Sequence, residues 1–508
     1  MIVNVMGQPR FISLEGKVKM MRTIESCFTH SRHPVRVLQF GEGRFMRAFV
    51  DYAIDVANEE QGFDGNVVIV TPRAARRPEG FTRQKNLYTV RLQGQQDGRK
   101  VVSNRVITCI DDVLSPVADY DAYMALARLG TLEYITSNTT DGGIVFSPDD
   151  KLEDRPPRTY PAKLTQFLFA RYQYFDGAED KGLIILPVEL IDHNGRTLRS
   201  CVNQYAALWN LPAAFLQWLD EACQFTDTLV DRIVTGYPDE QTAQAIQKEL
   251  GYTDELLDVA EPFALWAVEN PGLEKRLPFT STYFQTVFAP DITIYKERKV
   301  RILNGAHTSM VLGAYLAGLE YVGQCMADED IRPSLEQTVY GEILPTVPMA
   351  PDTVRSFADA VFERFENPFV HHELLAISLN STSKWKARIL PSLKDSLAST
   401  GKLPRWLTYS MAALLAFYRS EDKGDDCLIG HRGSNIYPIR DDADRLAFIA
   451  SHAALPDAGY VAAVLQQADW WGEDLTAIPG FSQAVTAHLA RIGAIGVRAH
   501  IREMVNEL

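Results

Sequence analysis

The chain has 508 residues, of which 46% are hydrophobic and 23% are charged. This length allows more than one folding unit, and the apolar content excludes an intrinsically disordered chain. The formal net charge is −14, and no block of lysine and arginine is long enough to follow a phosphate backbone, so we expect no nucleic-acid partner.

The six cysteines are widely scattered and form no CxxC pattern, which indicates free thiols in a reducing cytoplasm rather than a disulfide framework. The N-terminal stretch is mixed in polarity and lacks the apolar core of a signal peptide. The apolar runs fall short of the ~20 residues that cross a membrane. We therefore expect a cytoplasmic globular protein with no membrane partner.

The first half of the chain alternates short β-branched runs with helical stretches. The runs VRVLQF, NVVIVTP, VVSNRVITC, LEYITSN and LIILPVELI occupy residues 35–40, 66–72, 101–109, 132–138 and 183–191. Such alternation predicts a mostly parallel sheet with crossover helices, as in a Rossmann-like α/β domain.

After about residue 295, apolar residues recur at three- and four-residue spacing, as in SMVLGAYLAGLEYV (309–322) and RWLTYSMAALLAFY (405–418). That spacing predicts helices. We therefore predict a Rossmann-like dinucleotide-binding domain over residues 1–294 and a mainly α-helical substrate and catalytic domain over residues 295–508.

The first predicted strand runs into GEGRFMRAF (41–49), which places Gly41 and Gly43 where a strand turns into a helix. Glycines at this point let the backbone approach a pyrophosphate at the helix N-terminus. The fingerprint is partial, because Met46 stands where a third glycine is expected and VVIVTPRAARR (67–77) carries arginines in place of an acidic residue. An ordinary strand-to-helix turn remains the alternative, and this segment does not separate NAD from NADP.

The segment KERKVRILNGAHTSM (296–310) holds a second candidate site. If the strand-like VRIL leads into a helix near Asn304, then Asn304 and His307 share one helix face and Lys299 reaches back over them. A desolvated lysine can accept a hydroxyl proton while an amide donates to the developing alkoxide. The alternative is a surface lysine, a helix-capping asparagine and a core histidine.

Three further clusters are weaker. IDHNG (191–195) supplies Asn194 after a strand but is also ordinary turn sequence. ERFENPFVHHE (363–373) supplies Arg364 and the adjacent His371 and His372, which point in different directions on a helix and make no metal site without further ligands. Cys427 with His431 is likewise an isolated pair, so we expect no metal site. Tyr295 and Lys299 form a YxxxK like that of short-chain dehydrogenases, but too late in too long a chain for that family.

Over nearly its whole length the sequence resembles the polyol-specific long-chain dehydrogenases, the mannitol dehydrogenase family. GEGRFMRAF resembles the family's cofactor turn, SNTTDGG (137–143) its nicotinamide-side loop, and KVRILNGAH (299–307) its catalytic signature. The resemblance implies NAD as cofactor and no zinc. The cofactor-binding residues that it implies are Phe40, Gly41, Gly43, Arg44, Phe45, Asn138 and Thr139.

The same resemblance implies that Lys299 is the general base, that Asn194 and Asn304 hydrogen-bond the reacting oxygen, and that His307 orients the substrate. The motifs YPAKLT, ELIDHNG, TLVDRIVTGYP, YKERKV and RILP resemble family members that interconvert D-altronate and D-tagaturonate in hexuronate (galacturonate) catabolism. The implied partner is a small sugar acid. Arg364 is the first candidate for its carboxylate, with Lys384 and Asp231 as further substrate-binding residues.

Two other interpretations stay open. A family member acting on fructuronate and mannonate, or on mannitol and fructose, would share the cofactor turn and the Lys-Asn-His signature. A protein without catalysis could bind nucleotide or sugar acid as a sensor, although it would have no use for the complete proton-transfer set. The sequence does not indicate an oligomeric state.

Overall fold

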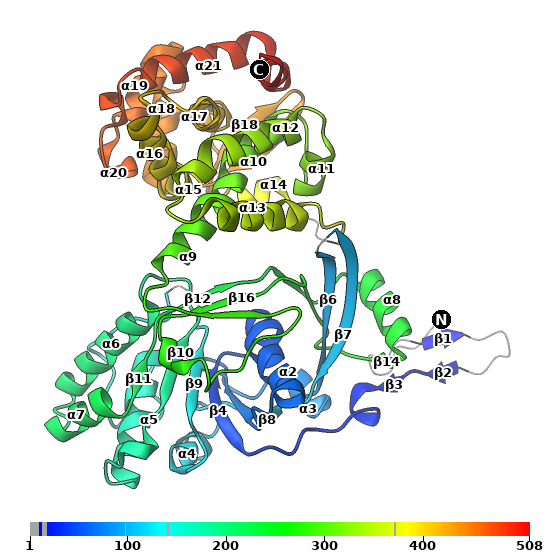
Figure 1. Ribbon diagram of the computed structural model, residues 1–508, viewed down its shortest axis with the longest axis vertical. Coiled ribbons are helices and arrows are strands. Elements are labelled where there is room, and N and C mark those ends of the chain that lie inside the picture. Colours follow the sequence, from blue (N-terminus) through cyan, green and yellow to red (C-terminus); the bar gives the residue numbers. More distant parts are fainter. Residues whose placement is uncertain (1–9, 13–17, 97, 140–141, 370–371, 508) are drawn as a thin grey trace. The chain divides into compact units, whose positions relative to one another are not determined.

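In the computed structural model (Figure 1), residues 10–12, 18–96, 98–139, 142–369 and 372–507 are described. Contacts divide the chain into two compact units, of which unit 1 comprises residues 1–93 and 100–292 and unit 2 comprises residues 94–99 and 293–508. The chain passes from unit 1 to unit 2 after Ile292, close to the change of pattern near residue 295. No helix in the described ranges is long and apolar enough to span a membrane.

Unit 1 is built on a six-stranded sheet in the order β11-β10-β9-β4-β5-β8, in which all neighbouring strands are parallel. The strands are β4 (Val35–Phe40), β5 (Asn66–Val70), β8 (Ile110–Leu114), β9 (Tyr134–Ser137), β10 (Ile184–Pro187) and β11 (Gln224–Phe225). The main connecting helices are α1 (Arg44–Met46), α2 (Tyr52–Glu60), α4 (Tyr120–Ala125), α5 (Tyr160–Tyr174), α6 (Asn194–Leu208) and α7 (Ala213–Glu221). The predicted Rossmann-like α/β domain is therefore confirmed.

Successive residues of the central strands enter opposite apolar cores. Val37 and Ile69 belong to the core that also holds α2, whereas Leu38 and Val70 belong to the core that holds α5 and α6. This two-residue alternation follows from the pleat of a strand. Because both faces are covered, the strands are continuous apolar runs, as the sequence pattern showed.

The strand expected over residues 101–109 forms, but it does not join the parallel sheet. It is β7 (Arg99–Ile107), which follows β6 (Tyr88–Gln96) after a short turn and lies in a separate sheet of order β13-β15-β6-β7. A short turn joins only antiparallel neighbours, so these residues cannot enter a parallel sheet beside β5. The other two strands of this second sheet are β13 (Val234–Gly236) and β15 (Asp258–Ala260). Unit 1 also contains β12 (Thr228–Asp231), β16 (Leu265–Val268) and β17 (Gln285–Phe288), which belong to a different sheet.

Unit 2 is mainly helical, which confirms the second half of the fold prediction. Its helices include α9 (Thr293–Arg298), α10 (Gly305–Leu316), α11 (Val322–Ala327), α12 (Ile331–Glu336), α13 (Pro351–Phe365), α14 (Leu374–Ile377), α15 (Ser381–Arg388), α16 (Leu390–Thr400), α17 (Arg405–Tyr418), α18 (Ala443–His452), α19 (Asp457–Leu465), α20 (Ala468–Trp471), α21 (Phe481–Ile495) and α22 (Val497–Asn506). A hairpin of β18 (Leu428–Arg432) and β19 (Asn435–Ile439) interrupts this pattern.

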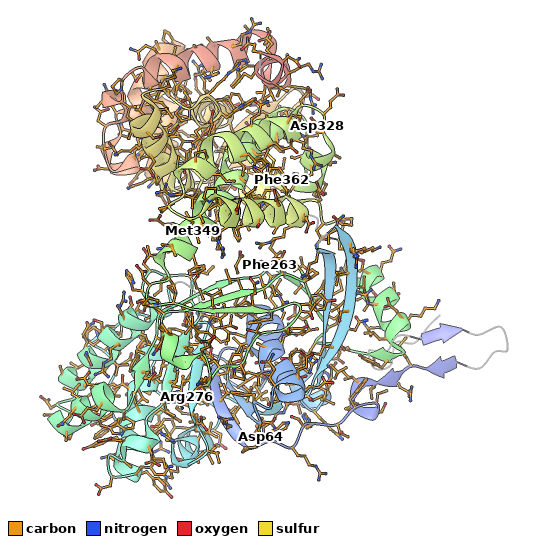
Figure 2. The ribbon with its side chains drawn as sticks, in the orientation of Figure 1. Asp64, Phe263, Arg276, Asp328, Met349 and Phe362 are labelled. Atoms are coloured by element: carbon orange, nitrogen blue, oxygen red, sulfur yellow. The ribbon has the colours of Figure 1, made fainter. Side chains whose placement is uncertain are left out.

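The core of unit 2 is formed around α17, which packs against both α10 and α21. Phe362 of α13, labelled in Figure 2, stacks on Tyr340 with ring centroids 5.3 Å apart. Trp385 of α15 is fully buried and meets Trp471 edge to face. These aromatic contacts bury large apolar areas and fix the angles at which the helices meet.

Two neighbouring histidines, half-buried His488 and buried His500, lie between the C-terminal helices of unit 2. His488 of α21 and His500 of α22 are joined through His488 Nδ1 and His500 Nε2 at 2.9 Å, and both rings meet Tyr409. Burial, followed by the charges of His500 and Arg405, lowers the pKa of His488 to about 4, and burial also lowers the pKa of His500. The folded protein therefore holds both rings neutral.

We predict that acid destabilises unit 2 through this pair. In the unfolded chain a histidine binds a proton below about pH 6.5, whereas folded His488 does not until the pH is much lower, so stability falls as the pH drops through that range. His488→Gln should reduce the stability lost between pH 7.5 and pH 5 by on the order of 1 kcal/mol. Melting temperatures measured across this pH range check it, with His431→Gln as an exposed control that should not reduce the acid sensitivity.

Candidate functional site

The first candidate site lies at the carboxyl ends of β4 and β9. The chain continues from β4 to β5 on one side and reaches β9 on the other, so the order of strands reverses between β4 and β9. Open parallel sheets bind ligands in the crevice at such a reversal. Both predicted cofactor segments, the glycine turn after Phe40 and the loop after Ser137, therefore begin at the carboxyl ends of these strands, where such a ligand is expected.

The glycine turn is built for close backbone approach. Gly41 has φ +118°, and a Cβ atom there would lie 2.8 Å from the carbonyl oxygen of Asn138. The Asn138 N–H in turn donates to the Phe40 carbonyl over 2.9 Å. Only glycine fits this contact, because any side chain would force the β4 and β9 loops apart.

Gly43 performs the second half of the turn. It precedes α1, which continues without a break through the π-helical segment η2 (Arg47–Asp51) into α2. Apart from Gly43 and its two chain neighbours, no heavy atom of the described residues lies within 4 Å of the position that a Cβ would take at Gly43. Gly43 and Arg44 at the start of this long helix are exposed, a location that suits the phosphates of a dinucleotide.

A buried carboxyl group supports the loop after β9. Glu189 accepts hydrogen bonds from the backbone N–H and the hydroxyl of Thr139, each at 2.9 Å, and from the Ser137 hydroxyl at 3.1 Å. Burial raises the pKa of Glu189 to about 7. The Thr139 hydroxyl is therefore used within the protein, whereas the Asn138 side chain makes no hydrogen bond with any described residue and is available to a ligand.

Arg44 and Phe45 are held by the protein around the turn. Arg44 is exposed, packs over Gly236, and donates from Nη1 to the Thr235 carbonyl over 3.0 Å. Phe45 stacks on Phe49 with ring centroids 4.9 Å apart. One Arg44 donor is thus used by a backbone carbonyl, and its other donors, together with the N–H groups of the turn, suit a pyrophosphate.

The segment after β5 carries no acidic side chain. Thr71 is buried and bonds the Leu114 carbonyl, Arg77 pairs with Asp112 at 2.7 Å, and Arg73 is exposed. In NAD-binding sheets a carboxylate near this point usually binds the adenine ribose. Its absence here keeps the choice between NAD and NADP open on geometric grounds.

Asn194 is used entirely by the fold of unit 1. Its side-chain amide donates to the carbonyls of Pro187, Glu189 and Thr228, and its Oδ1 accepts from the N–H groups of Gly195 and Thr228. Its exposed fraction is 1%. In this arrangement no amide hydrogen remains for a reacting oxygen, so we assign Asn194 to anchoring the start of α6 against β12.

The second candidate site lies on one long helix of unit 2. α9 continues through the π-helical segment η6 (Lys299–Asn304) into α10 without interruption. The expectation that VRIL forms a strand was therefore wrong, because Ile302 and Leu303 are buried by packing that overrides their local preference. π-helical turns are rare and occur frequently at functional sites.

This helix brings Lys299, Asn304 and His307 onto one short stretch. Lys299 opens the π-helical segment, Asn304 closes it, and His307 follows within the first turn of α10. Lys299 and Asn304 are half-buried and His307 is 5% exposed. Unlike Asn194, Asn304 directs no side-chain hydrogen bond to another residue in the described part of the chain, so its amide can serve a substrate.

His307 is a neutral, buried histidine with one ring nitrogen left for a ligand. Its ring stacks on Phe365 at 4.2 Å and meets His372 edge to face at 5.1 Å. Burial, followed by the charges of His372, Arg388, Arg364 and Lys384, lowers its pKa well below the ordinary value. Its Nε2 is buried without a hydrogen-bond partner among the described residues.

The charges around His307 identify a cationic cluster in unit 2, formed by Arg364, Lys384 and Arg388. Arg364 is 7% exposed. Lys384 donates to the Ile377 carbonyl over 2.8 Å, and burial lowers its pKa to about 8. Arg388 Nη1 donates to the Thr308 hydroxyl over 3.2 Å. Sequence reasoning found Arg364 and Lys384 but missed Arg388, although it stands in the RILP motif.

The remaining predicted residue, Asp231, lies in unit 1. It is a buried residue of β12 and pairs in register with Leu265 of β16. His371 lies outside the described residues, and no group of three metal-ligating side chains occurs among those that are described.

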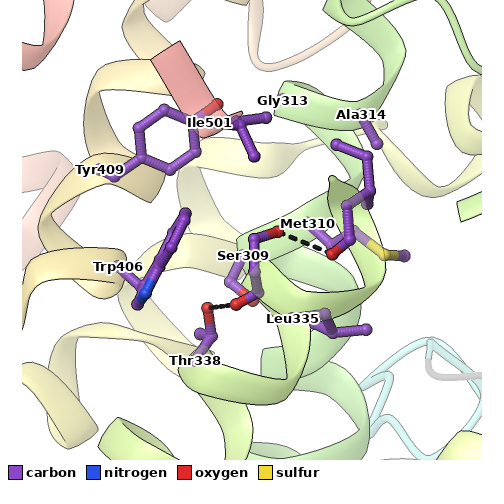
Figure 3. A pocket seen from close by; sticks show the side chains of 11 residues that line it. Ser309, Met310, Gly313, Ala314, Leu335, Thr338, Trp406, Tyr409 and Ile501 are labelled. Atoms are coloured by element: carbon purple, nitrogen blue, oxygen red, sulfur yellow. Dashed lines mark hydrogen bonds between the residues drawn. The ribbon is translucent and has the colours of Figure 1, made fainter. Parts of the chain in front are cut away.

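A small cavity in unit 2 is a poor candidate for substrate (Figure 3). It lies among α10, α12, α17 and α22 and has a volume of about 10 Å³. Its lining includes Ser309, Thr338, Trp406 and Tyr409. This volume fits about one water molecule.

Comparison with known proteins identifies the family. The model of the mannitol dehydrogenase Rossmann domain matches residues 35–280, and that of the mannitol dehydrogenase C-terminal domain matches residues 291–493. The chain belongs to the mannitol dehydrogenase family. The resemblance seen in the sequence is thus confirmed.

Curated relatives resemble the whole chain. The altronate oxidoreductase of Yersinia pestis is 43% identical over 482 residues, covering 93% of this chain and 98% of that protein. The altronate oxidoreductase of Klebsiella pneumoniae (strain 342) is 42% identical over 485 residues, covering 94% and 98%.

Two solved structures share the fold. The ternary complex of Pseudomonas fluorescens mannitol 2-dehydrogenase with NAD and D-mannitol has a TM-score of 0.67 at 21% identity, covering 95% of this chain and 96% of that one. Substrate-free D-sorbitol dehydrogenase has a TM-score of 0.74 at 20% identity, covering 92% and 95%. At these identities the similarity establishes the fold.

We predict that the two asparagines respond differently to substitution. Asn194→Ala should cost about 1–3 kcal/mol of stability, because it leaves buried backbone groups of Pro187, Glu189 and Thr228 without their partner. Asn304→Ala should change stability by less than about 0.5 kcal/mol. Denaturation curves of both variants check this, and an Asn194→Ala protein as stable as the parent would contradict the anchoring role.

Proposed function

We propose that the protein is an NAD-dependent oxidoreductase that interconverts D-altronate and D-tagaturonate. The observation that carries this proposal is the placement of Lys299, Asn304 and His307 on one helix of unit 2, with a cationic cluster of one buried and two half-buried side chains beside His307. A sugar acid brings a hydroxyl to oxidise and a carboxylate to bind, and this arrangement offers groups for both. The relatives named altronate oxidoreductase support the same substrate pair.

The reaction needs a base and a hydrogen-bond donor at one carbon. In the oxidative direction, Lys299 Nζ accepts the proton of the hydroxyl on the carbon next to the terminal hydroxymethyl group. NAD, when bound, would supply the hydride acceptor that allows this carbon to become a carbonyl. Asn304 donates an amide hydrogen to the oxygen as negative charge develops there. In reduction Lys299 returns the proton.

His307 is suited to orienting the substrate. Because burial holds it neutral, its Nε2 can exchange a hydrogen bond with a sugar hydroxyl without adding charge to the site. Its ring is fixed between Phe365 and His372. A fixed partner for a neighbouring hydroxyl selects one orientation of the reacting carbon.

Unit 1 supplies groups that fit a dinucleotide. Gly41 and Gly43 form the turn, the start of the α1–α2 helix would hold phosphate, and the Asn138 amide would be a donor for the nicotinamide. We propose NAD as the cofactor on the strength of the family resemblance. The exposed Arg73 after β5 gives no support to this choice.

The proposal is tested by assaying the purified protein with NADH against D-tagaturonate, D-fructuronate and D-fructose. The highest kcat/KM should be on D-tagaturonate. A higher value on D-fructuronate or D-fructose would assign the protein to one of the other substrate pairs of the family. No turnover of any of them would favour a binding protein without catalysis.

For the general base, we predict that Lys299→Ala lowers kcat by about 10²–10⁴-fold while the melting temperature and the Kd for NADH stay close to those of the parent. Stopped-flow rates together with NADH titration check this. Lys296→Ala, one helical turn earlier, is the control and should retain most of the activity. Near-parental turnover by Lys299→Ala at neutral pH would remove the lysine from the reaction.

For the cofactor, we predict a higher kcat/KM with NADH than with NADPH. Arg73→Asp should widen that preference, because a carboxylate repels a 2′-phosphate and can bind the ribose hydroxyls. Steady-state kinetics with both cofactors provide the measurement. Equal efficiencies in the parent, with a selective loss of NADPH activity in Arg73→Asp, would mean that Arg73 binds the phosphate.

A further inference from the structure

We propose that Arg388 binds the carboxylate of the sugar acid and that Thr308 positions it for this role. The inference rests on the proposed function and deepens it by naming the residue that selects an acid over a neutral sugar. It also moves the carboxylate contact from Arg364, the first candidate in the sequence, to a residue whose position the tertiary structure defines.

Arg388 lies against the helix that carries the reacting groups. The Arg388 guanidinium donates to the Thr308 hydroxyl over 3.2 Å. Its backbone carbonyl lies 3.4 Å from the position that a Cβ would take at Gly305. Arg388 ends α15, and α15 packs directly on α10. The side chain therefore has a defined position relative to Asn304 and His307.

Arg388 has no anion of its own within the described residues. Other arginines of unit 2 do: Arg419 pairs with Asp457, Arg432 with Glu320 and Arg445 with Asp441. Arg388 is half-buried, and burial lowers its pKa, with no carboxylate to compensate. A partly desolvated guanidinium gains most from an anionic ligand, and its planar donors match a carboxylate in bidentate geometry.

The spacing along α10 matches the substrate. Asn304 and Thr308 are one helical turn apart, about 6 Å along the axis. In D-tagaturonate three carbons separate the ketone carbon from the carboxylate carbon, which spans about 5 Å when extended. A ketone at Asn304 therefore places the carboxylate near the arginine that Thr308 holds. His307 stands between them, beside the intervening hydroxyls.

The other two cations are less suited to this contact. The Lys384 ammonium already donates to the Ile377 carbonyl and lies within electrostatic reach of Asp441. Arg364 is engaged by other groups of the protein. Both add positive potential around His307, so they favour an anion without fixing its position.

The test compares a charged ketose with its neutral counterpart. D-tagatose has a hydroxymethyl group where D-tagaturonate has the carboxylate. Arg388→Gln keeps a donor for Thr308 but removes the charge, so we expect KM for D-tagaturonate to rise about 10- to 100-fold. Any activity on D-tagatose should change by less than about threefold. Thr308→Val should raise KM for D-tagaturonate about threefold to tenfold and leave D-tagatose unaffected.

A matched control and a binding measurement complete the design. Arg355→Gln removes an exposed arginine of unit 2 that lies over the Tyr340 ring, and it should leave both KM values unchanged. Titration calorimetry with D-altronate and D-altritol, without turnover, should show that Arg388→Gln weakens only the acid. Melting temperatures verify that each variant is folded.

The outcomes separate this inference from the proposed function. If the parent reduces D-tagaturonate but Arg388→Gln loses activity equally on D-tagaturonate and D-tagatose, Arg388 is structural and the inference fails alone. If Arg364→Gln or Lys384→Gln gives the selective loss and Arg388→Gln does not, the carboxylate site lies there. If the parent does not reduce D-tagaturonate at all, the proposed function fails.

Discussion

The burial of α10 is the constraint on which the catalytic half of this protein depends. Every residue from Gly305 to Tyr315 is buried, because the helix is covered by α17, α14, α15 and α22. A helix enclosed in this way can neither rotate nor slide without opening a core. The groups at its start, Asn304, His307 and Thr308, are therefore held at fixed spacing, and the reaction proposed here uses that spacing.

The same burial sets the electrostatics of the region. Enclosing His307 keeps it neutral, and the cations Arg364, Lys384 and Arg388 around it reinforce that state. A neutral histidine among cations leaves a net positive environment in a chain whose total charge is −14. This local reversal of sign allows an acidic protein to bind an anionic substrate, because the potential at a partly buried site is set by the nearest charges.

Two asparagines that look equivalent in the sequence have different positions in the fold. Both precede a glycine, and both fall within a motif of the family. Asn194 gives its amide to three backbone carbonyls, whereas the Asn304 side chain makes no hydrogen bond with another residue of the described chain. Motif position thus identified residues that matter, and only the hydrogen-bond network distinguished an anchor from a group that can reach a substrate.

The sequence by itself determined the fold class, the change to helices near residue 295, the glycine turn after β4 and the Lys-Asn-His segment. Each of these follows from local periodicity or from residue types that a turn or a reaction requires. The tertiary structure decided the rest. In the tertiary structure VRIL is helical, and the strand at residues 101–109 belongs to a second sheet. The Asn194 side chain bonds the backbone of unit 1, and Arg388 lies beside Thr308. These outcomes depend on contacts between residues far apart in the chain, whose free energy exceeds local preference and leaves no pattern in a single sequence.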